Sequence, residues 1–285
     1  MKATLGERLR SLPFYILPHH GISWCIFRIA RLRWRPFKNF AIWIYTQLHA
    51  VNMEEAANSD KYSYVSLNAF FTRALKADAR PADSDSENWL CPVDGSVSQA
   101  GAINDGRIFQ AKGHEFSLQE LLGGDKALAS VFHNGKFATL YLSPRDYHRI
   151  HMPADAELRH MTYIPGRLFS VAAYTVRAIP RLFARNERVV CQFETGNGAM
   201  LMVLVGAINV SATETVWHGL VTGKHGKIQK YDYAAGEVRL QRGDEMGRFN
   251  LGSTVILITP ENFEFDAGIN AGETVYMGRK IGRPI

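Results

Sequence analysis

Short apolar or alternating runs, separated by Gly, Asn, Asp and Pro, make up most of the chain from about Pro81 onward. Runs of this length that end at turn residues are typical of β-strands. They outnumber the segments with helical periodicity, such as residues 117–122. The pattern therefore predicts a β-rich body over residues 81–285. Its clearest predicted strands are residues 137–142, 189–193, 199–210, 237–240 and 254–259.

The first 80 residues have a different pattern, which predicts amphipathic helices. On a helical wheel, residues 22–35 gather their aliphatic side chains on one face and most of their arginines on the other, although Arg33 falls on the apolar face. A second predicted helix, residues 37–45, contains Trp43 and follows Pro36, a residue that suits the first turn of a helix. The predicted apolar face consists of Ile22, Cys25, Ile26, Ile29 and Leu32, and the basic face of Arg28, Arg31 and Arg35.

Charge separates the same two regions. The first 50 residues carry eight Lys and Arg against one acid, Glu7, which gives +7; because the whole chain is +6, the remainder sums to −1. A basic amphipathic helix with interfacial Trp and Phe suits the surface of an anionic bilayer, where each cation adds about 1 kcal/mol. The alternative is that this helix packs on its own protein. Nucleic acid is a weaker interpretation, because no binding motif accompanies the charge.

Length and composition limit the class of protein. A chain of 285 residues with 46% hydrophobic content can bury a substantial core, either as one domain with an N-terminal extension or as two domains. No run approaches the roughly 18 apolar residues of a spanning helix, because residues 199–210 are interrupted by Gly206 and Asn209. We therefore expect no membrane-spanning helix.

The cysteines and the N-terminus indicate the compartment. Cys25, Cys91 and Cys191 have neither a disulfide nor a metal-ligand spacing, which suits a reducing compartment. Lys2 is followed by a mixed, charged stretch rather than by the apolar core of a cleavable signal. The cytoplasmic face of a membrane is the expected location.

Gly252 and Ser253 form a candidate self-cleavage site. The Ser253 hydroxyl can attack the Gly252 carbonyl, and glycine tolerates the close approach that this attack requires. The peptide becomes an ester, and elimination then leaves dehydroalanine, which hydrolyses to ammonia and a pyruvoyl group. Since Gly-Ser-Thr also suits an ordinary turn, the pair needs support from a base and a group that orients it.

Two further segments offer that support. His148 and His151 follow a Ser-Pro-Arg-Asp turn and precede Pro153, so both lie on a short extended or looped segment. Histidine suits proton transfer near neutral pH. Asp94 stands in an Asp-Gly turn that could present one carboxylate to an imidazole. The two histidines are three residues apart, but no further Cys/His cluster completes a metal site.

The motifs around these residues carry a family resemblance. Residues 141–153 read Tyr-Leu-Ser-Pro-Arg-Asp-Tyr-His-Arg-Ile-His-Met-Pro, and residues 245–254 read Glu-Met-Gly-Arg-Phe-Asn-Leu-Gly-Ser-Thr. Shorter matching segments occur within residues 111–122, 182–189 and 214–217. In order and spacing, from about Tyr64 to Val255, the chain resembles bacterial, membrane-associated phosphatidylserine decarboxylases of the pyruvoyl-dependent type.

The resemblance implies a role for each matching residue. Asp94, His151 and Ser253 match the family's self-cleavage triad, in which the histidine takes the serine proton and the aspartate holds the imidazole. Ser253 also becomes the pyruvoyl group, which forms a Schiff base with the substrate amine and acts as an electron sink. His148 matches a histidine of the decarboxylation step. Arg145 and Arg149 are tentative partners of the substrate phosphate.

The resemblance also implies an architecture and partners. The fold class is α+β, with N-terminal amphipathic helices (residues 1–80, facing the membrane) followed by a mainly antiparallel β-rich catalytic body. Cleavage between Gly252 and Ser253 gives a large chain (1–252) and a small chain (253–285). We expect phosphatidylserine in an anionic membrane as substrate, a homodimer and no metal.

The chain departs from the family pattern in places that do not touch the triad. Val93 stands where some relatives carry alanine, residues 211–213 replace a more glycine-containing stretch, and the tail after Thr259 is short.

Two other functions stay open from the residues alone. Asp94, His151 and Ser253 are also the residue types of a serine hydrolase, but the chain has no Gly-x-Ser-x-Gly elbow. A serine consumed in making a ketone cannot also turn over as a hydrolytic nucleophile, so an intact chain would favour the hydrolase. A non-catalytic β-domain that binds anionic lipid explains the basic N-terminal region but not the order of the candidate catalytic residues.

Overall fold

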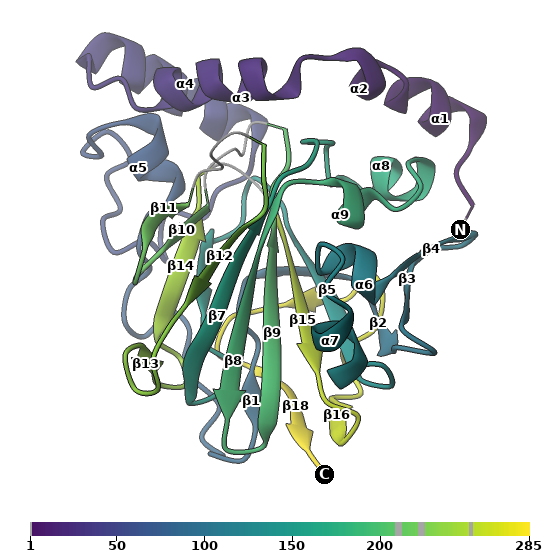
Figure 1. Ribbon diagram of the computed structural model, residues 1–285. Coiled ribbons are helices and arrows are strands. Elements are labelled where there is room, and N and C mark those ends of the chain that lie inside the picture. Colours follow the sequence, from purple (N-terminus) through teal and green to yellow (C-terminus); the bar gives the residue numbers. More distant parts are fainter. Residues whose placement is uncertain (1, 209–212, 222–225, 251–252) are drawn as a thin grey trace.

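A row of helices lies across one end of a β-rich body (Figure 1). The computed structural model describes residues 2–208, 213–221, 226–250 and 253–285. The N-terminal helices are α1 (Leu5–Ser11), α2 (Pro13–Ile16), α3 (His19–Ala30), α4 (Arg35–Leu48) and the short α5 (Leu67–Phe71). The body is built of strands, so the predicted α+β class is confirmed.

Local chemistry sets the ends of these helices. Thr4 and Glu7 form a capping box at the start of α1. The prediction of one helix over residues 22–35 is wrong at its C-terminal end, because α3 stops at Ala30 and α4 begins at Arg35. A continuous helix would press the ring of Pro36 against the carbonyl of Leu32, whereas proline is accommodated in the first turn of α4.

One large antiparallel sheet forms the centre of the body. Its strand order is β12-β7-β8-β9-β15-β5-β2-β17, with β13 paired to β7. Neighbouring strands are antiparallel throughout this described sheet. The strands are β2 (Gly95–Ala102), β5 (Lys136–Leu142), β7 (Ala156–Ile164), β8 (Arg188–Thr195), β9 (Gly198–Val205), β12 (Gln229–Asp232), β13 (Arg239–Leu240), β15 (Ser253–Thr259) and β17 (Thr274–Val275).

The predicted strands at 137–142, 189–193 and 254–259 are confirmed within β5, β8 and β15. The prediction for residues 199–210 is too long, because β9 ends at Val205, and residues 209–210 lie outside the described residues. Of residues 237–240, only Arg239–Leu240 form a strand, β13. The predicted helical segment 117–122 contains α6 (Leu118–Leu121), with Ser117 as its N-cap.

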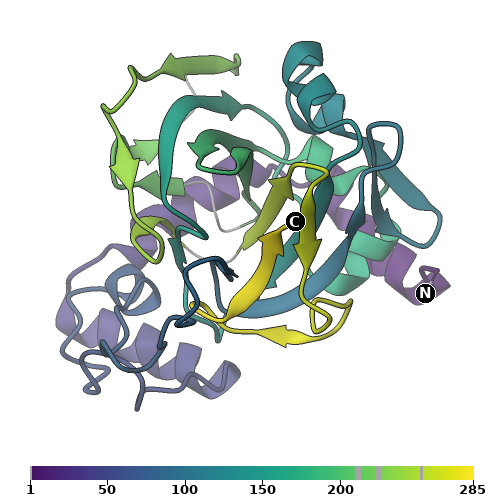
Figure 2. The same ribbon diagram turned by 90° about the horizontal axis from the view of Figure 1, so that it is seen from below.

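Smaller sheets and helices complete the body. One sheet runs β11-β10-β14-β6, a second β1-β18-β16, and β3 pairs with β4. Seen from the side opposite the helices, the C-terminal strands lie across the lower face of the body (Figure 2). The remaining elements are β1 (Trp89–Leu90), β3 (Arg107–Ala111), β4 (His114–Ser117), β6 (Arg149–His151), β10 (Thr213–Thr215), β11 (Gly219–Val221), β14 (Glu245–Phe249), β16 (Phe263–Phe265), β18 (Lys280–Pro284), α7 (Lys126–Val131), α8 (Ala173–Ala178) and α9 (Leu182–Arg185).

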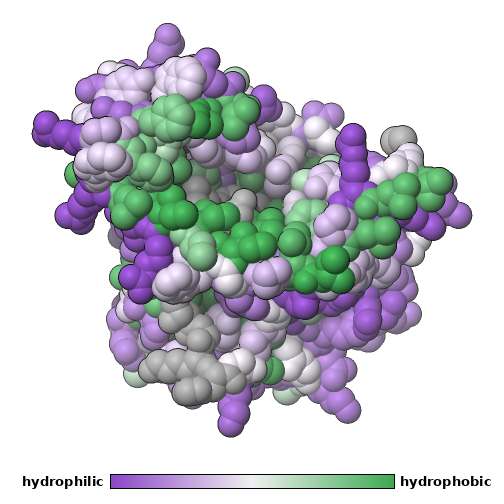
Figure 3. Space-filling view, turned by 90° about the horizontal axis from the view of Figure 1, so that it is seen from above, coloured by the Kyte–Doolittle hydropathy of each residue, from purple (hydrophilic) through white to green (hydrophobic). Residues whose placement is uncertain are grey.

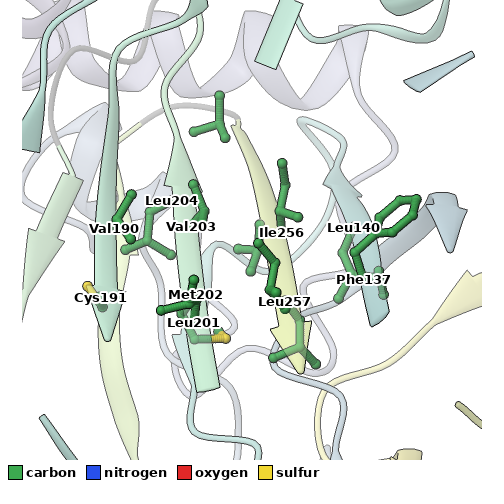
Figure 4. Close-up of a cluster of buried hydrophobic side chains, with 14 of the residues drawn as sticks. Phe137, Leu140, Val190, Cys191, Leu201, Met202, Val203, Leu204, Ile256 and Leu257 are labelled. Carbon is green, nitrogen blue, oxygen red and sulfur yellow. The ribbon is translucent and has the colours of Figure 1, made fainter. Parts of the chain in front are cut away.

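The hydrophobic core is centred on β9 and β15. Every residue of β15 is buried, because the strand lies between β9 and β5 and is covered on both faces. Figure 4 shows side chains such as Met202 of β9, Leu257 of β15 and Phe137 of β5 gathered in this core. A strand that is buried on both faces has a continuous apolar sequence instead of an alternating one. This explains why residues 254–259 could be predicted as a strand from the sequence.

Candidate active site

Ser253 is the first residue of β15 and lies opposite Leu142 of β5. Its side chain is fully buried, and its Oγ has no hydrogen-bond partner among the described residues. A buried hydroxyl without a partner is energetically unfavourable, and such groups often mark functional positions. Within the described residues, the Ser253 hydroxyl is therefore not tied to a structural hydrogen bond.

A cavity of about 350 Å³ lies next to Ser253, between the helices and the end of the sheet. Ile26 of α3, Tyr45 of α4 and Phe71 of α5 line it from the helical side, and Leu142 lines it from the sheet. The Tyr45 hydroxyl donates to the carbonyl of Pro144 at 2.5 Å, and burial raises the pKa of Tyr45. The cavity is thus mostly apolar, and its polar lining residues come from the helices, the sheet and a loop: Tyr45, His49, Tyr141, Ser170 and Ser253.

His148 is buried immediately before β6. Its Nδ1 lies 2.9 Å from the carbonyl of Asp146, so Nδ1 carries the hydrogen and Nε2 has a free lone pair with no partner among the described residues. The ring packs on Phe71, 3.9 Å between centroids, and Phe71 also lines the Ser253 cavity. Burial lowers the pKa of His148 to about 3, so the imidazole is neutral at neutral pH.

His151 is held by two hydrogen bonds that fix its tautomer. Its Nδ1 lies 2.8 Å from the Gly243 carbonyl, which can only accept, so Nδ1 donates. Its Nε2 therefore accepts from the hydroxyl of Tyr147, 3.0 Å away. Burial lowers the pKa of His151 as well. The lone pair that a general base would use is occupied by Tyr147.

Asp94 is bound by Arg80 rather than by a histidine. The Arg80 Nη2 lies 2.6 Å from Asp94 Oδ2, its Nε lies 3.0 Å from Oδ1, and the Met277 N–H donates to Oδ1 at 2.9 Å. Arg80 also pairs with Glu55 at 2.8 Å. In the described part of the chain, the recorded hydrogen bonds of Asp94 do not reach His151.

The three predicted triad residues nevertheless come from neighbouring segments. The His151 N–H donates to the carbonyl of Pro92, two residues before Asp94. On β5, Tyr141 pairs with Ser96 of β2 and Leu142 pairs with Ser253 of β15. The fold thus brings the segments of Asp94, His151 and Ser253 to one end of β5, without direct hydrogen bonds among the three side chains in the described residues. Gly252, the other side of the predicted cleavage bond, lies outside the described residues.

The two tentative phosphate partners differ in their surroundings. Arg149 is engaged by the protein, since its Nη1 pairs with Glu245 at 2.8 Å and its Nε donates to the Thr72 carbonyl at 3.0 Å. Arg145 is exposed, and its Nε lies 3.8 Å from Asp146 Oδ1. Arg145 is therefore the more available of the pair.

Sequence reasoning missed Tyr147, Arg80 and the carbonyl of Gly243. Tyr147 belongs to the 141–153 motif and could have been singled out by its position beside two histidines. Arg80 and Gly243 come from segments distant in sequence and offered no local signal. Among the described residues, no three His, Cys, Asp or Glu side chains are grouped so that they could hold a metal ion.

The helices carry an apolar outer surface. Figure 3 shows hydrophobic side chains in a band along the row of helices, with hydrophilic ones around it. None of the described helices is both long and apolar enough to cross a bilayer. The exposed large hydrophobic residues of this region, here called the apolar band, are Leu5, Leu9, Leu12, Ile16, Trp24, Ile29, Leu32, Trp34, Phe40, Trp43, Ile44 and Leu48.

Comparison with known proteins finds two matching family models and several similar proteins. The family model for phosphatidylserine decarboxylase matches residues 67–283, and a second model, described as PSD, matches residues 9–44. The chain is 52% identical over 286 residues to the phosphatidylserine decarboxylase proenzyme of Pseudomonas putida, covering 99% of both chains. It is 51% identical over 285 residues to that of Pseudomonas entomophila, covering 98% of this chain and 99% of the relative. Identity to the Pseudomonas aeruginosa proenzyme is 50% over 285 residues, with 99% of both chains covered.

Proposed function

The chain belongs to the phosphatidylserine decarboxylase family, and we propose that it converts phosphatidylserine to phosphatidylethanolamine with a pyruvoyl group made from its own Ser253. The relatives are named proenzymes, a word that implies processing of the chain. The single observation that carries the proposal within this molecule is the buried hydroxyl of Ser253, which lies beside a cavity and has no hydrogen-bond partner among the described residues. A ketone at this position would fit the same cavity.

The proposed self-cleavage begins at Ser253 Oγ. This oxygen bonds to the Gly252 carbonyl carbon as the peptide C–N bond breaks, and the serine proton passes through His151 to the released amine. Removal of the α-proton of residue 253 then breaks the ester, frees the Gly252 carboxylate and leaves dehydroalanine. Water replaces the nitrogen as ammonia and completes the ketone. For His151 Nε2 to accept the first proton, the Tyr147 hydroxyl must release it.

Asp94 acts in this proposal through its position near His151. The carboxylate would stabilise the imidazolium that forms during proton transfer. Arg80, which pairs with both Asp94 and Glu55, holds the Asp94 carboxylate in place, and the Gly243 carbonyl keeps the His151 ring in the tautomer whose Nε2 is the acceptor.

The ketone supplies an electron sink for the loss of carbon dioxide. His148 is proposed to carry the protons of this step at Nε2. With the anionic substrate beside it, the neutral His148 can take a proton at Nε2 from the substrate ammonium group as the amine becomes nucleophilic, because a nearby negative charge offsets the burial that lowers its pKa. It can then return that proton to the substrate carbon that has lost its carboxylate. No other described residue is required as the acid.

Residues 1–80 are proposed to face the membrane, and residues 81–285 to form the catalytic domain. The apolar band would enter the interface of an anionic bilayer, with the basic residues of the first 50 positions near the headgroups. A lipid substrate would then reach the Ser253 cavity from the helical side, where α3, α4 and α5 line it. Peripheral attachment at the cytoplasmic face and a homodimer stay predictions.

An intact mass spectrum of the purified protein under denaturing conditions tests the proposal. Two chains are expected, the smaller being the 33 residues 253–285 with a ketone at its N-terminus. The Ser253→Ala chain should stay whole and should not release carbon dioxide from phosphatidylserine. The Thr254→Val chain, which loses the neighbouring buried hydroxyl, should still split.

Other results would favour the alternatives. A whole wild-type chain with esterase activity that depends on Ser253 would indicate the hydrolase. A Ser253→Ala chain that still decarboxylates phosphatidylserine would refute the pyruvoyl mechanism.

A further inference from the structure

Arg73 is a buried cation that forms no salt bridge with any of the described residues. It lies two residues after α5 and is only 4% exposed, with its guanidinium over the ring of Phe70. Its Nη2 donates to the Arg145 carbonyl at 3.2 Å, but its Nε and Nη1 have no hydrogen-bond partner among the described residues. Burying a charge without a partner is costly, and burial lowers the pKa of Arg73 accordingly.

The same side chain lines a second cavity of about 330 Å³. The other charged groups of this cavity are already engaged. Arg80 binds Asp94 and Glu55, Asp146 Oδ2 accepts from the Ser143 N–H at 2.7 Å, and the exposed Arg145 lies 3.8 Å from Asp146 Oδ1. In the described part of the chain, Arg73 is the cation of this cavity for which no salt bridge is recorded, although Asp94 and Asp146 are near enough to act on its charge. A bound anion would supply the missing acceptors.

The Arg73 cavity and the Ser253 cavity lie on two sides of the same turn. Pro144 lines the Ser253 cavity, whereas its neighbour Arg145 lines the Arg73 cavity. The two sites also share an aromatic cluster, because the Tyr45 ring packs edge-on against both Phe70 and Phe71. Phe70 lies under Arg73, and Phe71 lines the Ser253 cavity.

We propose that Arg73 and its cavity bind the phosphodiester of the substrate headgroup while the substrate amine reaches residue 253. This inference rests on the proposed function. In phosphatidylserine the phosphate and the amine are only four bonds apart, so their sites must adjoin. A guanidinium matches phosphate oxygens with parallel N–H bonds.

The carboxylate of the substrate is a less suitable partner for Arg73. That group leaves as carbon dioxide, so an ion pair with it would stabilise the bound substrate more than the transition state and would slow the reaction. The phosphodiester keeps its charge throughout, and binding it orients the headgroup without opposing the chemistry.

The first test uses chains that cannot be processed and needs no activity. Inorganic phosphate should raise the melting temperature of the Ser253→Ala chain but not that of Ser253→Ala with Arg73→Met. Without phosphate, Arg73→Met should melt at the same temperature or higher, because an unpaired buried charge has been removed. Arg188→Met is the matched control: Arg188 is equally buried, but its three donors bind carbonyls of Leu121, Asn186 and Glu120, so this variant should melt lower and still respond to phosphate.

The second test uses the processed enzyme with phosphatidylserine in mixed micelles. Arg73→Met should split into two chains like the wild type, and its KM should rise tenfold or more with a smaller change in kcat, as expected for loss of a charged hydrogen-bond pair. Arg73→Lys should lie between the two. Inorganic phosphate should compete with phosphatidylserine in the wild type and not in Arg73→Met.

The possible failures are distinguishable. A fully split Arg73→Met enzyme with unchanged KM would overturn the phosphate site while leaving the proposed function intact. Phosphate that raises the melting temperature through Arg73 without competing with lipid would identify a site for free phosphate and would overturn the headgroup assignment. A wild-type chain that splits but does not act on phosphatidylserine would contradict the proposed function itself.

Discussion

Two histidines on one short segment, His148 and His151, are kept neutral by burial but have different hydrogen bonds. The Nε2 of His148 has no hydrogen-bond partner in the part of the chain that the structure describes, whereas that of His151 is occupied by the Tyr147 hydroxyl. This difference fits a division of labour in which His148 exchanges protons with the substrate and His151 serves once, during cleavage. Hydrogen bonding, rather than sequence position, separates the two roles.

The buried state of His148 predicts that acid destabilises the fold. The pKa of His148 is about 3 in the folded chain and near 6.5 when unfolded, so the unfolded chain binds more protons between these values. The contribution of neutral His148 to the free energy of unfolding is therefore present above about pH 6.5 and decreases as the pH falls. Between pH 6.5 and 5, the loss in unfolding free energy attributable to His148 should be about 2 kcal/mol.

Urea unfolding of the single-chain Ser253→Ala protein at the two pH values measures this loss. His148→Gln should remove it, whereas His218→Gln, at an exposed position, should leave it unchanged. An equal acid loss with and without His148 would contradict the prediction.

The Tyr147 hydrogen bond predicts a brake on self-cleavage. Tyr147→Phe removes the hydroxyl that occupies His151 Nε2, so the base becomes available more often. Since a neutral hydrogen bond contributes about 0.5 to 1.5 kcal/mol, chain splitting should become roughly two- to tenfold faster. A time course of splitting after synthesis in vitro measures the rate, with Tyr163→Phe, whose hydroxyl binds Glu187, as the control. Slower splitting of Tyr147→Phe would show that the hydroxyl assists rather than restrains the base.

The candidate site residues that belong to a sequence motif could be selected from the sequence. Their hydrogen-bond partners could not. Ser253, His148 and His151 were selected because their order matches a family pattern. The Arg80 clamp on Asp94 and the Gly243 carbonyl at His151 depend on segments 14 and 92 residues away. Such contacts are set by tertiary packing, which local pattern does not encode.

At the scale of elements, the helical pattern predicted amphipathic helices without indicating which face points outward. The face of α3 toward the body contains His19, Ser23 and Ala30, whereas Ile29, on the predicted apolar face, is 48% exposed. Arg31, predicted on the basic face, turns toward the body and donates to Asn250 at 3.2 Å. Helical periodicity shows that apolar and polar side chains lie on opposite faces of a helix. Which face packs on the body depends on the neighbouring elements, and the periodicity does not reveal it.

The apolar band predicts vesicle binding that can be removed without unfolding. Ile16→Glu combined with Trp34→Glu should reduce binding to anionic vesicles by at least tenfold, because each side chain contributes about 1.5 kcal/mol or more when buried in lipid. The melting temperature should change little, since Ile16 and Trp34 are 85% and 70% exposed. Flotation with vesicles measures binding, and Val131→Glu, an exposed site on α7, serves as the control. Unchanged flotation of the double variant would rule out the band as the attachment surface.

At the scale of the whole molecule, the helices and the sheet together enclose the site. That helices precede the β-rich body was predictable, because the hydrophobic periodicity changes along the chain and the excess of basic charge lies in the first 50 residues; the boundary at residue 80 stays a prediction. The strand order was not, because β15 inserts between β5 and β9, which come much earlier in the chain. Antiparallel pairing between distant strands leaves no local signature.

The position of β15 between two other strands should hold the small chain in place after a cut before Ser253. β15 pairs with β5 over seven residues and with β9 over five, and its side chains lie in the core, so cleavage removes one covalent bond and leaves both ladders in place. The small chain should therefore co-elute with the large chain on gel filtration in native buffer and separate only in denaturant.

Leu257→Asp places a carboxylate in the middle of this core and should release the small chain or prevent folding, since a buried unpaired charge is strongly destabilising. Glu261→Lys, at an exposed position of the same chain, should leave it bound. Release of the wild-type small chain in native buffer would mean that the connection through residue 252, and not the sheet, holds β15 in place. Retention would explain how residue 253 can become a new chain terminus and still keep its position at the cavity.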